Sequence, residues 1–180
     1  FALANDLSVQ ANYQQVSDEI DVTSLVDYIL INSFVVCTDW INWNTSWWRG
    51  LDPSGSHLKW GYVLWDEDAT FNHYINYTGV PNENPDADPC YPEGITAEQH
   101  IVLLNKLLEN EEFRQYYITR YMDLMNTAFK EEEMIGVLEG IENAIAPEMP
   151  QHIERWGGSM GQWQDNVQKI KDFINDRIDY

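Results

Sequence analysis

Apolar residues recur at helical spacing through most of the chain, so the sequence predicts a mainly helical fold. The first strong pattern runs from residue 22 to about residue 37, and Asp21 directly before it is a suitable N-cap. The apolar side of this predicted helix carries Leu25, Val26, Ile29 and Phe34. Residues 1–20 are polar and lightly patterned, and we predict a lead-in there that is either a short helix or an extended segment.

Helical patterns return in the second half of the chain and continue to its end. The residues predicted to begin these helices are Thr96, in a capping box with Gln99, then Asn110, and finally Ser159. Another helix is predicted from Glu131 to Ala146, ending before Pro147. Arg155 and Trp156 lie where the chain breaks between helices, and we interpret them as a structural anchor.

One β-hairpin is predicted early in the chain. Two aromatic, β-prone runs cover residues 45–49 and 57–65, and Asp52-Pro53-Ser54-Gly55 between them is a turn sequence. Residues 69–95 are rich in Asn, Pro, Gly and Asp, which predicts a long loop of the kind that usually has a function or is mobile. The 180 residues are predicted to form one α+β domain that is mainly α.

The charge balance of the chain narrows the choice of partners. Asp and Glu total 30 against 10 Lys and Arg, which gives a formal net charge of -20. Nucleic acids and anionic membranes are bound by basic faces, so the sequence argues against both partners. No apolar run approaches the roughly 18 residues of a membrane span. An aromatic content of 13% argues against a disordered chain.

The candidate chemistry lies between Asp39 and Asp68. Asp39 and Asn44 are spaced D-x4-N in a predicted loop after the first buried helix, and the hairpin then leads to Asp66 and Asp68. A helix, a D-x4-N loop, a hairpin and a terminal Asp follow one another in this order in the catalytic half of protein kinases. In that arrangement the first Asp accepts a proton from the attacking hydroxyl, and the Asn and the second Asp bind Mg²⁺.

Simpler structural roles are available for the same residues. Asp39 and Asn44 would order their loop through side-chain bonds to the backbone. Asp66, Glu67 and Asp68 would form a solvated acidic face, although their mutual repulsion favours a cation between them. The four histidines are scattered without metal-ligand spacing and are interpreted as structural.

The tryptophans and cysteines leave alternatives open. The tryptophans of the loop and first strand form either a sugar-stacking platform or part of the core, and we favour packing against the C-terminal helices. Neighbouring strand residues point to opposite faces, so Trp47 and Trp48 cannot both be core on a one-sided hairpin. Cys37 and Cys90 form either one disulfide or two free buried thiols.

Several stretches of the chain resemble the CotH spore-coat kinase family. The similar residues are Val22 to Tyr28, Asp39 to Asn44, Lys59 to Asp68, Thr70, Phe71, Leu103 to Arg114, His152 to Gly157, Trp163, and Phe173 to Arg177. The resemblance covers nearly the whole chain, and its most specific parts are the W-D-x-D and R-W-G motifs.

The resemblance implies an atypical protein kinase that transfers phosphate from metal–ATP to Ser or Thr of a protein. Carried over to this chain, it makes Asp39 the catalytic base and Asn44 and Asp66 ligands of Mg²⁺ or Mn²⁺, with Asp68 as a second candidate ligand. It implies a helical, kinase-like C-lobe fold with residues 69–95 as an activation-type loop. It also implies a secreted or cell-envelope protein of a bacterium.

The part of a kinase that binds the nucleotide is not recognisable in the sequence. A glycine-rich loop and a strand lysine paired to a helix glutamate should precede the first long helix, yet residues 1–21 contain no Lys and no Gly. We therefore expect this chain to be a C-lobe without its N-lobe. We also expect the chain alone to be inactive and not to retain metal–ATP. The acidic charge favours a basic or Ser-rich protein substrate.

Two other function classes fit the residues less well. One is a non-catalytic module that binds a glycan or a protein on a pseudokinase scaffold, with the tryptophans as its contact surface. The other is a two-carboxylate glycosidase that uses Asp39 with Asp66, although two such carboxylates are easily found among 30.

Overall fold

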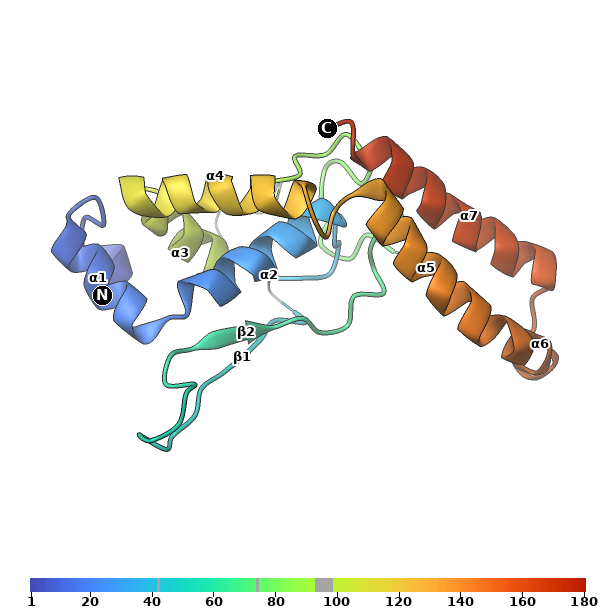
Figure 1. Ribbon diagram of the computed structural model, residues 1–180, viewed down its shortest axis with the longest axis horizontal. Helices are drawn as coiled ribbons and strands as arrows, with labels where there is room; N and C mark the ends of the chain where they lie inside the picture. Colours follow the sequence, from blue (N-terminus) through green and yellow to red (C-terminus); the bar gives the residue numbers. More distant parts are fainter. Residues whose placement is uncertain (42, 74, 93–98) are drawn as a thin grey trace.

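The computed structural model describes residues 1–41, 43–73, 75–92 and 99–180. Its elements in chain order are η1 (Ala2–Ala4), α1 (Gln10–Glu19), α2 (Val22–Phe34), β1 (Ser46–Trp48), β2 (Gly61–Val63), α3 (Gln99–Leu107), α4 (Glu111–Met125), α5 (Glu131–Ile145), η2 (Ala146–Glu148), α6 (Met149–Trp156) and α7 (Met160–Arg177). Helices α1 to α4 and the hairpin form a body, and α5, α6 and α7 form an arm that projects from one end of it (Figure 1). The fold is therefore mainly helical with one small sheet, as predicted.

Helix α2 is the centre of the body. It begins at the predicted cap, where Asp21 accepts a 3.1 Å hydrogen bond from the backbone N–H of Ser24. The fully buried side chains of α2 are Leu25, Val26, Ile29, Leu30 and Phe34. They belong to one cluster with Ile101, Leu104 and Leu107 of α3 and Phe113 of α4. The helix ends at Phe34, earlier than predicted, because Val36 adopts a left-handed φ of 51° that a helix cannot continue.

The hairpin forms as predicted, but its paired strands are shorter. The antiparallel register joins Ser46 to Val63, Trp47 to Tyr62 and Trp48 to Gly61. The backbone N–H of Gly55 closes the predicted turn on the carbonyl of Asp52 at 2.9 Å. The hairpin is attached to the start of α2, because Ser24 Oγ accepts a 2.8 Å hydrogen bond from the backbone of Tyr62. Farther along the chain, the backbone N–H of Thr38 donates a 2.9 Å hydrogen bond to the carbonyl of Ala69, which joins the loop after α2 to the segment after β2.

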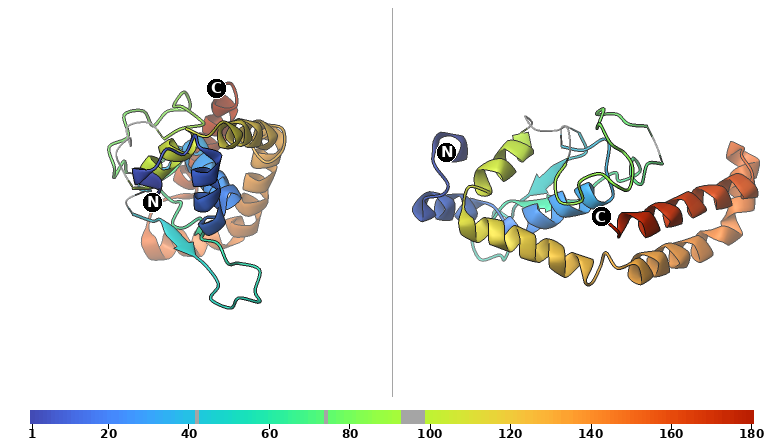
Figure 2. Two further views of the ribbon diagram at one scale, coloured as in Figure 1. Left: turned by 90° about the vertical axis from the view of Figure 1, so that its left-hand side faces the viewer. Right: turned by 90° about the horizontal axis from the view of Figure 1, so that it is seen from above.

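The two neighbouring tryptophans of β1 are both about half exposed. Trp47 lies 5.0 Å from the His100 ring of α3, and Trp48 lies 4.7 Å from the His57 ring of the hairpin. The predicted packing against the C-terminal helices is therefore wrong for Trp47 and Trp48. The physical reason is that the last helices lie in the arm, which extends away from the body and from the hairpin turn (Figure 2). Trp40 of the preceding loop, by contrast, is 2% exposed and lies in the core cluster with Ile101 of α3 and Phe113 of α4.

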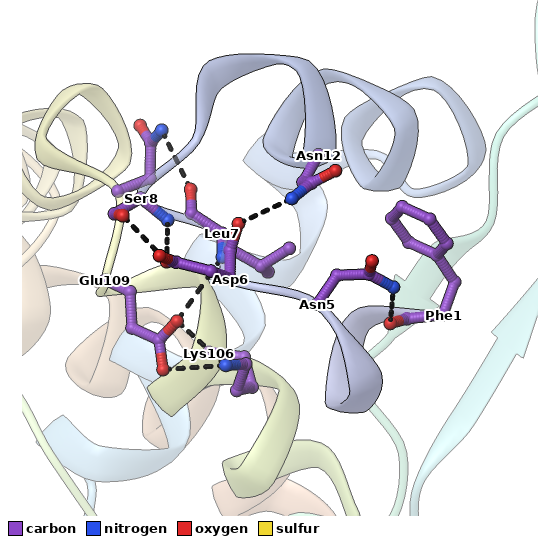
Figure 3. Close-up of polar contacts among 9 residues, drawn as sticks. Phe1, Asn5, Asp6, Leu7, Ser8, Asn12, Lys106 and Glu109 are labelled. Atoms are coloured by element: carbon purple, nitrogen blue, oxygen red, sulfur yellow. Dashed lines mark hydrogen bonds and ion pairs between the residues drawn. The ribbon is translucent and has the colours of Figure 1, made fainter.

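The N-terminal segment is tied to the junction of α3 and α4 (Figure 3). Leu7 is fully buried, and its backbone N–H donates to Glu109 at 3.4 Å. Asn110 caps α4 as predicted by accepting from the backbone of Phe113 at 3.1 Å, and its amide also donates to the Leu7 carbonyl at 3.2 Å. The lead-in is thus an integral part of the body, with α1 as its predicted short helix.

The arm is an antiparallel pair of helices, α5 and α7, joined at the tip by η2 and α6 (Figure 2). The predicted break before Pro147 occurs, but the chain continues through η2 into α6, because proline is tolerated in the first turn of a helix. Ser159 caps α7 as predicted, accepting from the backbone of Gln162 at 3.2 Å. Trp156 lies at the tip with 69% of its surface exposed, so its predicted role as a structural anchor is wrong. Only the stacking of Arg155 over its ring, at 4.8 Å, is present.

A buried arginine fixes the end of the arm to the body. Arg177, the last residue of α7, has no exposed surface. Its guanidinium donates to the carbonyls of Ser33 at 2.9 Å and Phe34 at 2.8 Å, at the end of α2. It also donates to the carbonyls of Pro85 and Ala87 in the long loop. One side chain therefore joins α7, α2 and the loop.

Three further expectations from the sequence concern single features. Cys37 and Cys90 are both free thiols, so the disulfide alternative is excluded for this structure. None of the helices in the described ranges is long and apolar enough to cross a membrane. The predicted capping residue Thr96 lies outside the described residues.

Two glycines inside α5 lower its stability without a packing reason. A methyl group at Gly136 or Gly140 would meet no atom within 4 Å. Replacing both by alanine is expected to raise the free energy of unfolding by about 1 kcal/mol per site, because glycine is a poor helix former. Urea unfolding followed by circular dichroism measures the change. The control Gly157→Ala should destabilise, because Gly157 has a φ of 87°. Lower stability of the α5 double variant would contradict this prediction.

Candidate active site

The loop after α2 holds the carboxylate of Asp39 in one fixed position. Asp39 is buried, with 6% of its surface exposed. Asn44 Nδ2 donates a 2.7 Å hydrogen bond to Asp39 Oδ2, and the thiol of Cys37 donates to Oδ1 at 3.4 Å. The structure therefore brings together two of the predicted site residues, Asp39 and Asn44. It adds Cys37, which the sequence did not single out for this role.

The backbone around this loop is strained. The described non-glycine residues with positive φ are Val36, Ile41, Asn44, Asp66, Phe71 and Asn72. Ile41, at 75°, is β-branched and strongly disfavours this conformation. Two predicted site residues, Asn44 at 40° and Asp66 at 59°, belong to the set. Strained residues cluster at functional sites, where the surrounding structure holds them in place. No pattern in the sequence predicts this strain.

The acidic residues after β2 differ in the solvent exposure of their side chains. Asp66 and Asp68 are exposed, whereas Glu67 is partly buried. Glu67 Oε2 is inaccessible to solvent and has no hydrogen-bond partner among the described residues. The sequence analysis treated Glu67 only as part of an acidic face. No strand alternation indicated the inward position of Glu67, because β2 ends at Val63, Asp66 has a left-handed φ of 59° and residues 67 and 68 lie in a turn.

The buried carboxyls hold their protons more tightly than usual. Burial raises the pKa of Asp39, and the nearby charges of Asp68 and Asp66 raise it further. Burial also raises the pKa of Glu67 to about 7, with the charge of Asp39 as an additional cause. Asp39, Asp66, Glu67 and Asp68 are thus close enough to influence one another electrostatically. Such an excess of negative charge favours a bound proton or a bound cation.

The carboxyls do not form a closed metal cage. The described part of the chain contains no group of three or more His, Cys, Asp or Glu residues arranged to hold a metal ion. The oxygen donors at this site are exposed Asp66 and Asp68 and the carbonyl oxygen of Asn44, which remains after its amide nitrogen binds Asp39. This open set of hard oxygen donors suits Mg²⁺, which typically takes one or two carboxylates and completes its shell with water and phosphate.

The long loop is tied to the residue next to Asp39. Thr38 Oγ1 donates to the carbonyls of Ala69 at 3.2 Å and Ile75 at 3.0 Å. The Thr38 carbonyl in turn accepts from the backbone of Thr78 at 3.0 Å and from its hydroxyl at 2.8 Å. The described residues of the loop, 69–73 and 75–92, contain no helix or strand. Its first part is therefore positioned by the same turn that carries Asp39.

An aromatic hollow lies on the hairpin, separate from the acidic cluster. It has a volume of about 290 Å³, and its walls are Ile20, Trp47, Trp60, Tyr62, His100 and Leu103. Tyr62 Oη and His100 Nδ1 are 2.8 Å apart, which fixes both rings. The guanidinium of Arg49 lies 5.0 Å from the Trp60 ring. Flat aromatic walls of this kind suit a planar or ring-shaped ligand.

The pKa of Glu67 makes stability depend on pH in the absence of metal. The folded-state pKa of about 7 lies above the ordinary value of 4.5, so the folded state binds the proton more tightly. The free energy of unfolding should therefore fall as pH rises from about 4.5 to about 7. Glu67→Gln should remove this fall and stabilise the chain at pH 8 by about 1–2 kcal/mol, since water screens part of the full shift. Urea unfolding at pH 5 and pH 8 with EDTA tests this. A variant with the wild-type pH slope would contradict it.

Comparison with known proteins gives one match. The model of the family described as CotH kinase protein matches residues 1–180. Neither a curated protein nor a solved structure matches the chain. The matched range contains the Asp39 loop, the hairpin and the acidic residues after it.

Proposed function

Because the chain belongs to the CotH kinase family, we propose that it supplies the catalytic half of a protein kinase, folded as a kinase-like C-lobe. The reaction is transfer of the γ-phosphoryl group of ATP to a Ser or Thr hydroxyl of a protein. The observation that carries the proposal is the buried carboxylate of Asp39, fixed by Cys37 and Asn44 beside the acidic residues after β2. We also propose the cell envelope or spore surface of a bacterium as the location, in agreement with the family.

Asp39 is proposed as the catalytic base. One of its oxygens is occupied by the amide of Asn44, and the other accepts only the long, weak hydrogen bond from the Cys37 thiol. That second oxygen, Oδ1, is able to accept the proton of a substrate hydroxyl. As the proton moves, the hydroxyl oxygen forms a bond to the γ-phosphorus, and the bond between that phosphorus and ADP breaks. Burial raises the pKa of Asp39, which makes its carboxylate a stronger base.

Asn44, Asp66 and Asp68 are proposed as ligands of Mg²⁺ or Mn²⁺. The ion would neutralise charge on the β- and γ-phosphates during transfer. The carbonyl oxygen of Asn44 and the exposed carboxylates of Asp66 and Asp68 are the donors left free for it. Because these donors do not complete a coordination shell, the metal is expected to bind together with ATP, whose phosphates supply the remaining oxygens. The same positive charge would lower the pKa of Glu67.

The long loop is proposed to position the protein substrate, in the role of an activation-type loop. The hydrogen bonds of Thr38 to Ala69, Ile75 and Thr78 place the start of this loop next to Asp39. The net charge of -20 would repel acidic substrates. A basic or Ser-rich protein is therefore the expected substrate class.

The proposal is tested by phosphate transfer from Mg²⁺·ATP to a mixture of histones, followed by phosphoamino-acid analysis. The measurement uses the intact protein, meaning one that contains both the proposed catalytic half and a nucleotide-binding lobe, because the 180-residue chain alone is expected to be inactive. Asp66→Ala is expected to reduce transfer by at least about 100-fold, because the metal loses a carboxylate ligand. Glu154→Ala is the matched control, since it removes one exposed acid from the arm and should leave activity unchanged. Equal rates of phosphate transfer by the wild type and Asp66→Ala would contradict the proposal.

The aromatic hollow favours a second candidate function, a non-catalytic module that binds a glycan or protein segment. Trp47 and Trp60 present ring surfaces there, and Trp47 remains 45% exposed. In that case a ligand should quench tryptophan fluorescence equally in the wild type and in Asp66→Ala, and Trp47→Ala should abolish the response. Loss of the response in Asp66→Ala would favour the kinase instead.

A further inference from the structure

Two polar side chains at the end of α2 are buried without a hydrogen-bond partner. Asn32 and Ser33 are 1% and 4% exposed, and neither Asn32 Oδ1 nor Ser33 Oγ meets a partner among the described residues. The backbone carbonyls of both residues are already occupied, by the N–H of Cys37 at 2.9 Å and by the guanidinium of Arg177 at 2.9 Å. Buried polar atoms in folded proteins are nearly always hydrogen-bonded. The two side-chain oxygens therefore point to a partner that is not part of the chain.

The hydrogen bond of the Asn32 amide defines which of its atoms needs this partner. Asn32 Nδ2 donates to the carbonyl of Tyr28 at 2.9 Å, within the same helix. Exchanging the amide oxygen and nitrogen would set Oδ1 against that carbonyl, and two acceptors repel each other. The atom without a partner is thus an acceptor. Ser33 Oγ can donate as well as accept, so a small molecule that does both is complementary to the pair.

Asn32 and Ser33 line a small cavity between α2 and the long loop. Its other walls come from the turn that carries Asp39 and from the loop itself, and they include Cys37, Trp40, Val80 and Asn82. The cavity leaves about 20 Å³ for the centre of a water molecule. About 10–15 Å³ measured in this way is enough to hold one water. The space therefore suits a single water molecule and is too small for an organic ligand.

We propose that this cavity binds one structural water molecule, which donates to Asn32 Oδ1 and shares a second hydrogen bond with Ser33 Oγ. Two polar partners in a small cavity meet the usual requirements of a buried water. Because loop residues form part of the wall, the water is enclosed only when the loop lies against the end of α2 (Figure 1). Its binding therefore stabilises that position of the loop, as any ligand stabilises the state that binds it. This inference does not depend on the proposed phosphate transfer.

A high-resolution crystal structure of the chain tests the proposal directly. One ordered water is expected at about 3 Å from both Asn32 Oδ1 and Ser33 Oγ. Absence of density at this position would overturn the proposal. A Ser33 hydroxyl that is turned to bond a carbonyl of α2 would overturn it as well, because the hydroxyl would then need no water. Density for an ion in place of water would also contradict it.

The variant Ser33→Ala tests the proposal in solution. Alanine is the better helix former, and in a dry cavity it would also remove a buried hydroxyl without a partner, so the urea midpoint of unfolding would rise. With a bound water the midpoint should fall, because the water loses one of its two partners. Amide hydrogen exchange in the loop residues 80–91 should also become about two- to tenfold faster.

Ser17→Ala is the matched control for this variant. Ser17 is also a buried serine within a helix, 9% exposed, but its hydroxyl donates to the Gln14 carbonyl of α1 at 3.0 Å. The control should leave hydrogen exchange in the long loop unchanged. A midpoint of Ser33→Ala at or above the wild-type value would overturn the proposal, and so would loop exchange equal to that of Ser17→Ala.

Discussion

Asp39→Asn is expected to lower the rate of phosphate transfer by the intact protein by about 10²–10⁴-fold while leaving the affinity for Mg²⁺·ATP nearly unchanged. The amide has the same shape as the carboxylate and keeps an oxygen for the hydrogen bond from Asn44, but it cannot accept a proton. Initial rates with radiolabelled ATP and a histone mixture give kcat and KM separately. The loss should lie in kcat, since a base acts in the transition state.

The control for this variant is Asp123→Asn, the same chemical change at an exposed position of α4. It should retain the full rate. If Asp39→Asn keeps more than about a third of wild-type kcat, a proton-accepting role for Asp39 is excluded. The simpler role of ordering the loop would then be the better interpretation.

Arg177→Met is expected to lower the free energy of unfolding by about 3–5 kcal/mol. Methionine fills similar space but offers no donors, so the carbonyls of Ser33, Phe34, Pro85 and Ala87 lose their shared partner. Two of these carbonyls end α2, where a positive charge is also favourable. Urea unfolding followed by circular dichroism measures the loss.

Arg155→Met is the matched control for the anchor. It removes an arginine that is exposed at the tip of the arm, so its effect should stay within about 0.5 kcal/mol. If Arg177→Met unfolds at the same urea concentration as Arg155→Met, the four carbonyl contacts do not hold the arm to the body. A shift confined to Arg177→Met supports the anchor.

Local signals predicted the individual helices well. Asp21, Asn110 and Ser159 each accept the capping hydrogen bond that their positions indicate. Caps act within one helical turn, so neighbouring residues are sufficient to predict them. The arrangement of α5 and α7 as a projecting arm depends on contacts between distant segments, which no local pattern encodes. The exposure of Trp156 and the full burial of Arg177 were unpredictable for the same reason.

The candidate site was only partly predictable. The spacing of Asp39 and Asn44 placed them in one short loop, where the structure joins them by a hydrogen bond. The left-handed backbone of Ile41 carries no compositional signal, because a β-branched residue strongly disfavours it, and Asp66 tolerates this conformation without requiring it. The thiol contact of Cys37 and the inward position of Glu67 depend on how the hairpin meets the end of α2. Those contacts are set by tertiary structure.

The most direct test of the central claim is calorimetric titration of Mg²⁺·ATP into a protein that contains both the proposed catalytic half and a nucleotide-binding lobe, and into its Asp66→Ala variant. The account predicts saturable binding that requires both metal and nucleotide, that is lost in Asp66→Ala, and that survives in Glu154→Ala. Binding of equal strength in Asp66→Ala, or no binding of Mg²⁺·ATP by the wild type, would contradict the assignment of this chain as the catalytic half of a kinase.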